Sequence, residues 1–118
     1  VHCVAACGRD NADIPAAVNA LPHGGDILSC LDDDAFDPSI VPSVIGRSPG
    51  GLTYWQVVDL LDGCAARGRI AGLSLTEFMP GADIGGLGAL TVTSIMAHAI
   101  GLIGRQAQTP KDSEKASL

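Results

Sequence analysis

The chain of 118 residues has the length of one domain, and hydrophobic residues make up 47% of it, which is enough to build a core. Only 17% of the residues are charged, a composition that favours much buried surface, as in a piece of a larger body or a subunit of an oligomer. The formal net charge is −6 and the Lys and Arg residues form no basic face, so we expect no nucleic-acid partner.

The cysteines indicate a reducing environment. Cys3, Cys7, Cys30 and Cys64 do not have the C-x-x-C spacing of a structural zinc site. We interpret Cys30 and Cys64, which stand in apolar runs, as reduced core residues. The first residues have neither the basic start nor the long apolar run of a signal peptide. We therefore expect a cytoplasmic protein.

The first predicted elements are a short helix and a strand. "DIPAAVNALPHGG" predicts a helix that begins at Asp13, with Pro15 in its first turn. "DILSCL", residues 26–31, predicts a short strand without alternation, which is typical of a parallel sheet buried on both faces. An acidic cluster, "DDDAFDP", follows directly. Residues 38–51 hold three prolines and three glycines and predict an ordered loop, a type that is often functional.

A helix, a second strand and a last helix are expected next. Thr53 and Gln56 have the spacing of a capping box, and Gly68 is expected to end the helix. "IAGLSL", residues 70–75, predicts a second buried strand, and residues 86–105 the last helix. The helix after Thr53 has an apolar stripe formed by Val57, Leu60, Leu61 and Cys64.

Residues 84–104 carry no charge, and an uncharged run of about 20 residues is long enough to span a membrane. Five glycines, three hydroxyl residues and His98 interrupt this run. We therefore interpret it as a buried helix, with His98 as a satisfied core histidine, and expect no membrane partner. The domain is expected to cover residues 1–106, and residues 107–118 a polar, disordered tail.

This order of elements is βαβα, which predicts an α/β fold with a parallel sheet and flanking helices. Ligands bind such sheets outside the carboxyl ends of the strands. An acidic cluster follows the first strand and Glu77 follows the second strand, so both groups are expected at the same edge of the sheet. The acidic cluster consists of Asp32, Asp33, Asp34 and Asp37.

Asp32 and Asp34 are candidate metal ligands. In an extended segment, residues two apart face the same way, and two converging carboxylates repel each other unless a cation lies between them. Oxygen ligands favour magnesium, calcium or manganese. The alternative is a turn whose carboxylates cap the following backbone. Asp33 is expected to point away, as a solvated or structural residue, and Asp37 to be a turn residue.

Glu77 has two possible roles. A carboxylate at the end of an apolar strand can accept two parallel hydrogen bonds from a guanidinium and so bind a cationic substrate. It can also cap a helix or stand at the edge of a loop. Its position alone does not decide between these roles.

Three linked segments resemble the ureohydrolase family, which includes arginase and agmatinase. "LDDDAFDPSIVP" is similar to its D-x-D motif followed by Asp-Pro, and "PGGLTYWQVVDLL" to its GGLT segment. "IAGLSLTEFMPGADIGGLGALT" is similar to the strand that ends in the family's substrate-binding glutamate. The resemblance covers residues 23–106, is agmatinase-like, and lies in the C-terminal part of the family's domain.

The resemblance implies an arginase-like three-layer fold, here partial, and an enzyme that binds two manganese ions. It implies hydrolysis of a small guanidino compound, such as agmatine or guanidinobutyrate, by a metal-bridging hydroxide, with release of urea. Asp32 and Asp34 would then bind metal, and Glu77 would bind the guanidinium of the substrate.

Two departures from the family pattern stand out. The family's upstream His-containing and Asp-Ala-His-x-Asp motifs are not in this sequence, and two carboxylates cannot hold two metals alone. The chain is therefore interpreted as incomplete by itself, or alternatively as a non-catalytic domain with a role in assembly. "SVIGRSPGG" differs from the family's commoner loop, and its Arg47 is expected to face an anionic substrate tail or solvent. A half-sheet leaves an open edge and an apolar face, so we also expect self-association into a homo-oligomer.

Overall fold

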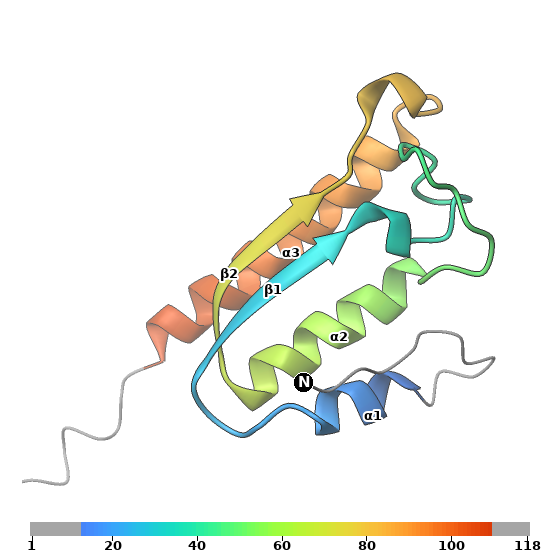
Figure 1. Ribbon diagram of the computed structural model, residues 1–118. Coiled ribbons are helices and arrows are strands. Elements are labelled where there is room, and N and C mark those ends of the chain that lie inside the picture. The colour runs from blue at the N-terminus through green and yellow to red at the C-terminus, as the bar shows by residue number, and fades with distance from the viewer. Residues whose placement is uncertain (1–12, 110–118) are drawn as a thin grey trace, which may run out of the picture.

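The computed structural model describes residues 13–109, in which two parallel strands pack against helices (Figure 1). Short 3-10 turns follow each strand, at Asp33–Ala35 and Pro80–Ala82. The elements are α1 (Asp13–Asn19), β1 (Asp26–Asp32), α2 (Tyr54–Arg67), β2 (Arg69–Thr76) and α3 (Leu87–Gln108). The predicted α/β fold with a parallel sheet and flanking helices is confirmed.

The boundaries of α2 follow from its sequence. The hydroxyl of Thr53 accepts a hydrogen bond from the amide of Gln56, and the side chain of Gln56 accepts one from the amide of Thr53. This capping box satisfies amides that lack a partner within the first turn. Gly68 ends the helix at a point where the chain passes close to Gly25. A Cβ atom on Gly68 would lie 2.7 Å from the Gly25 carbonyl oxygen, so a glycine is favoured there.

The register of the two strands determines where their ends meet. Ile27 lies opposite Ile70, a bulge follows, and Leu28 then lies opposite Gly72. The pairing continues without a further shift to Asp32, which lies opposite Thr76. Both strands therefore reach the same edge of the sheet, as the sequence predicted.

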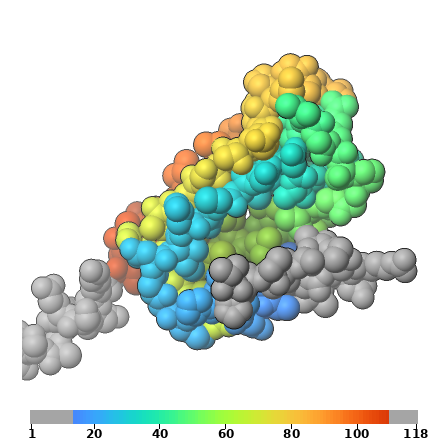
Figure 2. Space-filling view, in the orientation of Figure 1, coloured from blue at the N-terminus to red at the C-terminus, as the bar shows by residue number. Residues whose placement is uncertain are grey.

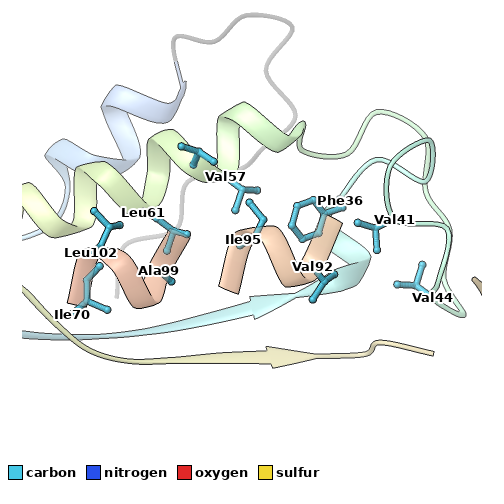
Figure 3. Packing of buried hydrophobic residues seen from close by; sticks show 11 residues of the cluster. Phe36, Val41, Val44, Val57, Leu61, Ile70, Val92, Ile95, Ala99 and Leu102 are labelled. Carbon is cyan, nitrogen blue, oxygen red and sulfur yellow. The ribbon is translucent and has the colours of Figure 1, made fainter. Parts of the chain in front are cut away.

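The hydrophobic core lies between α2, α3 and one face of the two strands (Figure 3). The amide group of Gln106 donates to the carbonyl oxygens of Ala65 and Gly68, and its oxygen accepts from the Ile70 amide. These bonds tie the end of α3 to the junction of α2 and β2. The buried hydrophobic residues are Phe36, Val41, Val44, Val57, Val58, Leu61, Ile70, Val92, Ile95, Ala99 and Leu102.

The opposite face of β1 is open. Along β1, exposed and half-buried residues alternate, and the side chain of Leu28 is 71% exposed. Figure 2 shows β1 and β2 at the surface that faces the viewer. The expectation of a strand buried on both faces, with Cys30 in the core, is wrong for this chain, and Cys30 is exposed. Residues 13–109 provide helices for one face only, so nothing among them covers the other.

By length and composition, α3 is the one helix in the described part of the chain that could cross a membrane. One side of it packs into the core, however, through Val92, Ile95, Ala99 and Leu102. The rest of the helix exposes Leu90 and Ile100, so the expectation of a buried helix is correct for one side of α3 only. His98 lies at the margin of the core, where its Nε2 is 2.7 Å from Oδ1 of Asp62, so the predicted partner for this histidine is present.

Candidate active site

The edge of the sheet where both strands end carries the predicted site residues. Asp32 is the last residue of β1, and Glu77 follows the last residue of β2. Since Asp32 lies opposite Thr76, Glu77 stands one residue beyond this pair. Adjacent strands lie about 4.8 Å apart, so the two acidic segments are neighbours in space.

Asp32 caps the turn that follows β1. Its Oδ1 accepts a hydrogen bond of 2.9 Å from the amide of Asp34, which belongs to the 3-10 turn Asp33–Ala35. The expectation of an extended segment through Asp34 is therefore wrong, and the alternative of a capping turn is correct for Asp32. The physical reason is that amides at the start of a helical turn need acceptors, which a short carboxylate supplies locally.

Asp33 and Asp34 place unpaired carboxylate oxygens inside the protein. Asp33 is 0% exposed, and neither of its oxygens has a hydrogen-bond partner among residues 13–109. Oδ1 of Asp34 is likewise buried without a partner there. Burial, and then the charges of Asp32 and Asp34, raise the pKa of Asp33 to about 6. The solvated interpretation of Asp33 is therefore wrong.

Asp37 organises the loop of residues 38–51. Its Oδ1 accepts from the amide of Ser39 at 2.9 Å, and its Oδ2 accepts from the amide of Gly50 at 3.0 Å. The hydrogen bond from the Ser39 side chain, followed by the one from the Ser39 amide, holds the pKa of Asp37 below its ordinary value. The predicted turn role of Asp37 agrees with these contacts.

The glycine pair of this loop allows a close approach of two chain segments. Gly50 has a φ of +81°, which favours glycine. A Cβ atom on Gly51 would lie 2.4 Å from the carbonyl carbon of Phe36, so only glycine fits there. This contact stands beside a parallel bridge between Phe36 and Leu52. The Gly-Gly sequence thus holds the loop against the segment after β1.

The carboxylate of Glu77 is exposed and has no hydrogen-bond or ion-pair partner within residues 13–109. Its backbone has a φ of +67°, in the left-handed region that residues with a Cβ rarely adopt. The helix-cap interpretation therefore has no support among the described residues. A free carboxylate at this edge is available to a cationic ligand.

Arg47 has partners that the sequence did not reveal. Its Nε donates to the carbonyl oxygen of Pro42 at 2.7 Å, and its Nη2 donates to that of Ala82 at 2.7 Å. Arg47 is nevertheless exposed, so the expectation that it faces solvent agrees with the structure, while an anionic substrate tail as its partner stays a prediction. Its partners are backbone carbonyls, which any residue provides, so no motif could have identified them.

Ser43 is a second residue that sequence reasoning missed. It is 0% exposed, and its hydroxyl has no hydrogen-bond partner among the described residues. Its carbonyl oxygen accepts from the amide of Met79, which comes shortly after Glu77. Ser43 thus joins the segments that follow the two strands.

The residues present match a hard metal ion in kind but not in number. Asp32 and Asp34 offer carboxylate oxygens, and the unpaired Oδ1 of Asp34 is a free ligand atom. Within residues 13–109, however, no group of three or more His, Cys, Asp or Glu side chains could hold a metal ion. These residues would therefore need further ligands to hold two ions.

Comparison with known proteins identifies the family. The arginase family model matches residues 8–101. The N(1)-aminopropylagmatine ureohydrolase of Thermus thermophilus is 40% identical over 99 residues, which are 84% of this chain and 32% of that protein. The agmatinase of Pyrococcus horikoshii is 30% identical over 88 residues, which are 75% of this chain and 30% of that protein.

A solved structure agrees on the fold. Proclavaminate amidino hydrolase from Streptomyces clavuligerus superposes with a TM-score of 0.70 at 23% identity, over 78% of this chain and 31% of that one. The chain thus spans about a third of the length of the relatives that it matches. On the family match and the sequence identity together, this chain belongs to the arginase family, and it is agmatinase-like.

Proposed function

We propose that this chain is part of a ureohydrolase that cleaves a guanidino compound and releases urea. The observation that carries the proposal is the parallel register, which brings the acidic segment after β1 to the same edge of the sheet as Glu77, whose carboxylate is exposed. In this arrangement, anionic groups for metal ions and an anionic group for a guanidinium stand at one edge of a sheet. That edge is where parallel sheets bind ligands.

Asp32 and Asp34 would contribute carboxylate ligands to a site for two manganese ions, which ligands outside residues 13–109 would complete. When bound, the manganese ions supply a water molecule of lowered pKa as the nucleophile. The buried and unpaired Oδ1 of Asp34 supports its assignment, because a buried carboxylate oxygen without a partner is costly.

Glu77 would bind the guanidinium of the substrate. A carboxylate matches the two parallel N–H groups of a guanidinium and so orients the carbon that is attacked. We propose a substrate of the agmatine or guanidinobutyrate type, and the names of both relatives above, which refer to agmatine or an agmatine derivative, support the agmatine type. We further propose that the enzyme is cytoplasmic. We also propose that it forms a homo-oligomer, since the chain exposes apolar surface at Leu28 and Ile100.

The second candidate function is a non-catalytic domain with a role in assembly. Its support is the incomplete set of metal ligands within residues 13–109. Both candidates predict the same fold, so only metal binding and turnover can separate them.

A chimera tests the proposal. Residues 23–106 of this chain would replace the matching segment of the Thermus thermophilus relative, and urea release from agmatine and N(1)-aminopropylagmatine would be measured with manganese. We expect turnover, and we expect Glu77→Gln to lower kcat/KM about 10- to 150-fold, since a hydrogen bond to a charged group contributes ~1.5–3 kcal/mol.

The matched control in the chimera is Asp59→Asn, which removes an exposed carboxylate on α2 and should leave turnover unchanged. Calorimetry would count the manganese ions, and Asp32→Ala with Asp34→Ala should abolish their binding. A folded chimera that binds two manganese ions and releases no urea would sink the enzyme proposal and favour the non-catalytic candidate.

A further inference from the structure

Arg47 joins the two loops that follow the strands. The first loop is residues 38–51 and the second loop is residues 77–86. The guanidinium of Arg47 donates to Pro42 in the first loop and to Ala82 in the second, each at 2.7 Å. A guanidinium is planar and its donors have a fixed geometry, so two such bonds hold the acceptors at a defined separation.

The second loop is held at two further points. The amide of Met79 donates to the carbonyl oxygen of Ser43 at 2.7 Å. The carboxylate of Asp83 accepts from the amides of Ala89, Gly88 and Ile84, and these bonds, foremost the one from Ala89, hold the pKa of Asp83 below its ordinary value. Contacts at Met79, Ala82 and Asp83 thus tie the second loop to the first loop and to the start of α3.

Glu77 lies between two fixed points and has an unusual backbone conformation. On one side, Thr76 is paired opposite Asp32, and on the other side Met79 is bonded to Ser43. The φ of Glu77 between them is +67°, where the Cβ atom is disfavoured. Such a conformation persists only where the surrounding structure imposes it, and conformations of this kind cluster at functional sites.

We propose that Arg47 is a positioning residue that holds the second loop so that Glu77 keeps its left-handed backbone at the ligand-binding edge of the sheet. The inference rests on the proposed function, because it gives Glu77 the role of binding the guanidinium. Arg47 itself would touch neither metal nor substrate. It acts through Ala82 and the loop that connects Ala82 to Glu77.

The test uses the full chain without metal or substrate. Arg47→Ala is compared with Arg105→Ala, which removes the same charge from an exposed position on α3. Nuclear magnetic resonance would report the backbone of Glu77 through its HN–Hα coupling and Cα shift. Hydrogen exchange would report the amides of Met79, Ala82 and Asp83.

We expect Arg47→Ala to shift the Glu77 signals away from the left-handed values and to speed exchange in the second loop at least 10-fold. Exchange at Val57 and Leu61 in α2 should stay unchanged, since the hydrogen bonds of Arg47 reach only the two loops. Arg105→Ala should behave as the wild type does. Unchanged Glu77 signals in Arg47→Ala, or equal effects of both substitutions, would overturn the proposal.

Two further variants keep the test decisive. Arg47→Lys keeps the charge but loses the planar guanidinium, so it should fold and show part of the shift in the Glu77 signals. It replaces Arg47→Ala if that variant does not fold. Glu77→Gly removes the disfavoured Cβ and should raise the melting temperature, whereas Glu77→Ala should not. None of these readouts needs urea release, so a failed chimera assay would leave the result for Arg47 intact.

Discussion

At the scale of single residues, Asp33 couples the acidic segment to the stability of the chain. Its carboxyl group is fully buried without a partner among residues 13–109, and burial, followed by the charges of Asp32 and Asp34, raises its pKa to about 6. The folded state therefore binds this proton more tightly than the unfolded chain does. The corresponding stability is present at low pH and is lost as the pH rises through the folded pKa.

This linkage predicts the pH dependence of Asp33→Asn. With a chelator present, the free energy of unfolding of the wild type should fall by on the order of 2–3 kcal/mol between pH 4 and pH 7. This magnitude follows from ~1.4 kcal/mol for each unit by which the pKa is raised. Asp33→Asn should lose much less over this interval, because it has no proton to release there. Urea denaturation at a series of pH values measures both. Asp59→Asn, an exposed change on α2, should keep the wild-type slope, and equal slopes for all three chains would contradict the prediction.

At the scale of elements, α3 has two sides with opposite roles. Ile95 is 0% exposed between α2 and the sheet, whereas Ile100, on the same helix, is 65% exposed. Removing a buried side chain loses its transfer free energy and leaves a cavity, but truncating an exposed one does neither. The same substitution at these two positions therefore measures how α3 packs.

Ile95→Ala is expected to lower the free energy of unfolding by about 2–5 kcal/mol, and Ile100→Ala by less than about 0.5 kcal/mol. Denaturant titration followed by circular dichroism measures both. If Ile95→Ala leaves too little folded chain, Ile95→Val, at about 0.5–1.5 kcal/mol, gives a measurable difference. Similar losses at the two positions would contradict the packing of α3 with Ile95 buried and Ile100 exposed.

At the scale of the whole molecule, the sheet within residues 13–109 has two strands, and each has an unpaired edge. A two-stranded sheet is marginally stable by itself, and open edges and apolar faces pair with other chains. Leu28 stands exposed on the open face of β1. An apolar groove runs beside β2 and α3, lined by Leu73, Leu75, Met96, Ala99, Ile100 and Ile103.

We predict that the purified chain self-associates at micromolar concentration, which size exclusion with light scattering measures. Leu28→Lys should shift the distribution toward the monomer, because a charge on the open face opposes association. Ala66→Lys, which adds the same charge on the exposed surface of α2, should not. A sharp monomer peak of the wild type would refute the prediction.

Local sequence patterns were sufficient to predict the helices, the strands and the family. The capping box at Thr53 and Gln56 marked the start of α2, and both predicted strands appear with nearly the same limits. These signals are local, because a cap and an apolar period need only a few neighbouring residues. The roles of Asp32, Asp34 and Glu77 remain predictions that rest on their positions in the three motifs.

By itself, the sequence determined the order of the elements, the parallel sheet, the edge at which the acidic residues gather, and the membership of the arginase family. Only the tertiary structure decided that Asp33 is buried, that Glu77 has a left-handed backbone, and that Arg47 bonds Pro42 and Ala82. The reason is that burial and loop conformation depend on segments far apart in the chain, as with Arg47 and Ala82, which are 35 residues apart. Such contacts involve backbone groups that every residue carries, so no pattern of side chains predicts them.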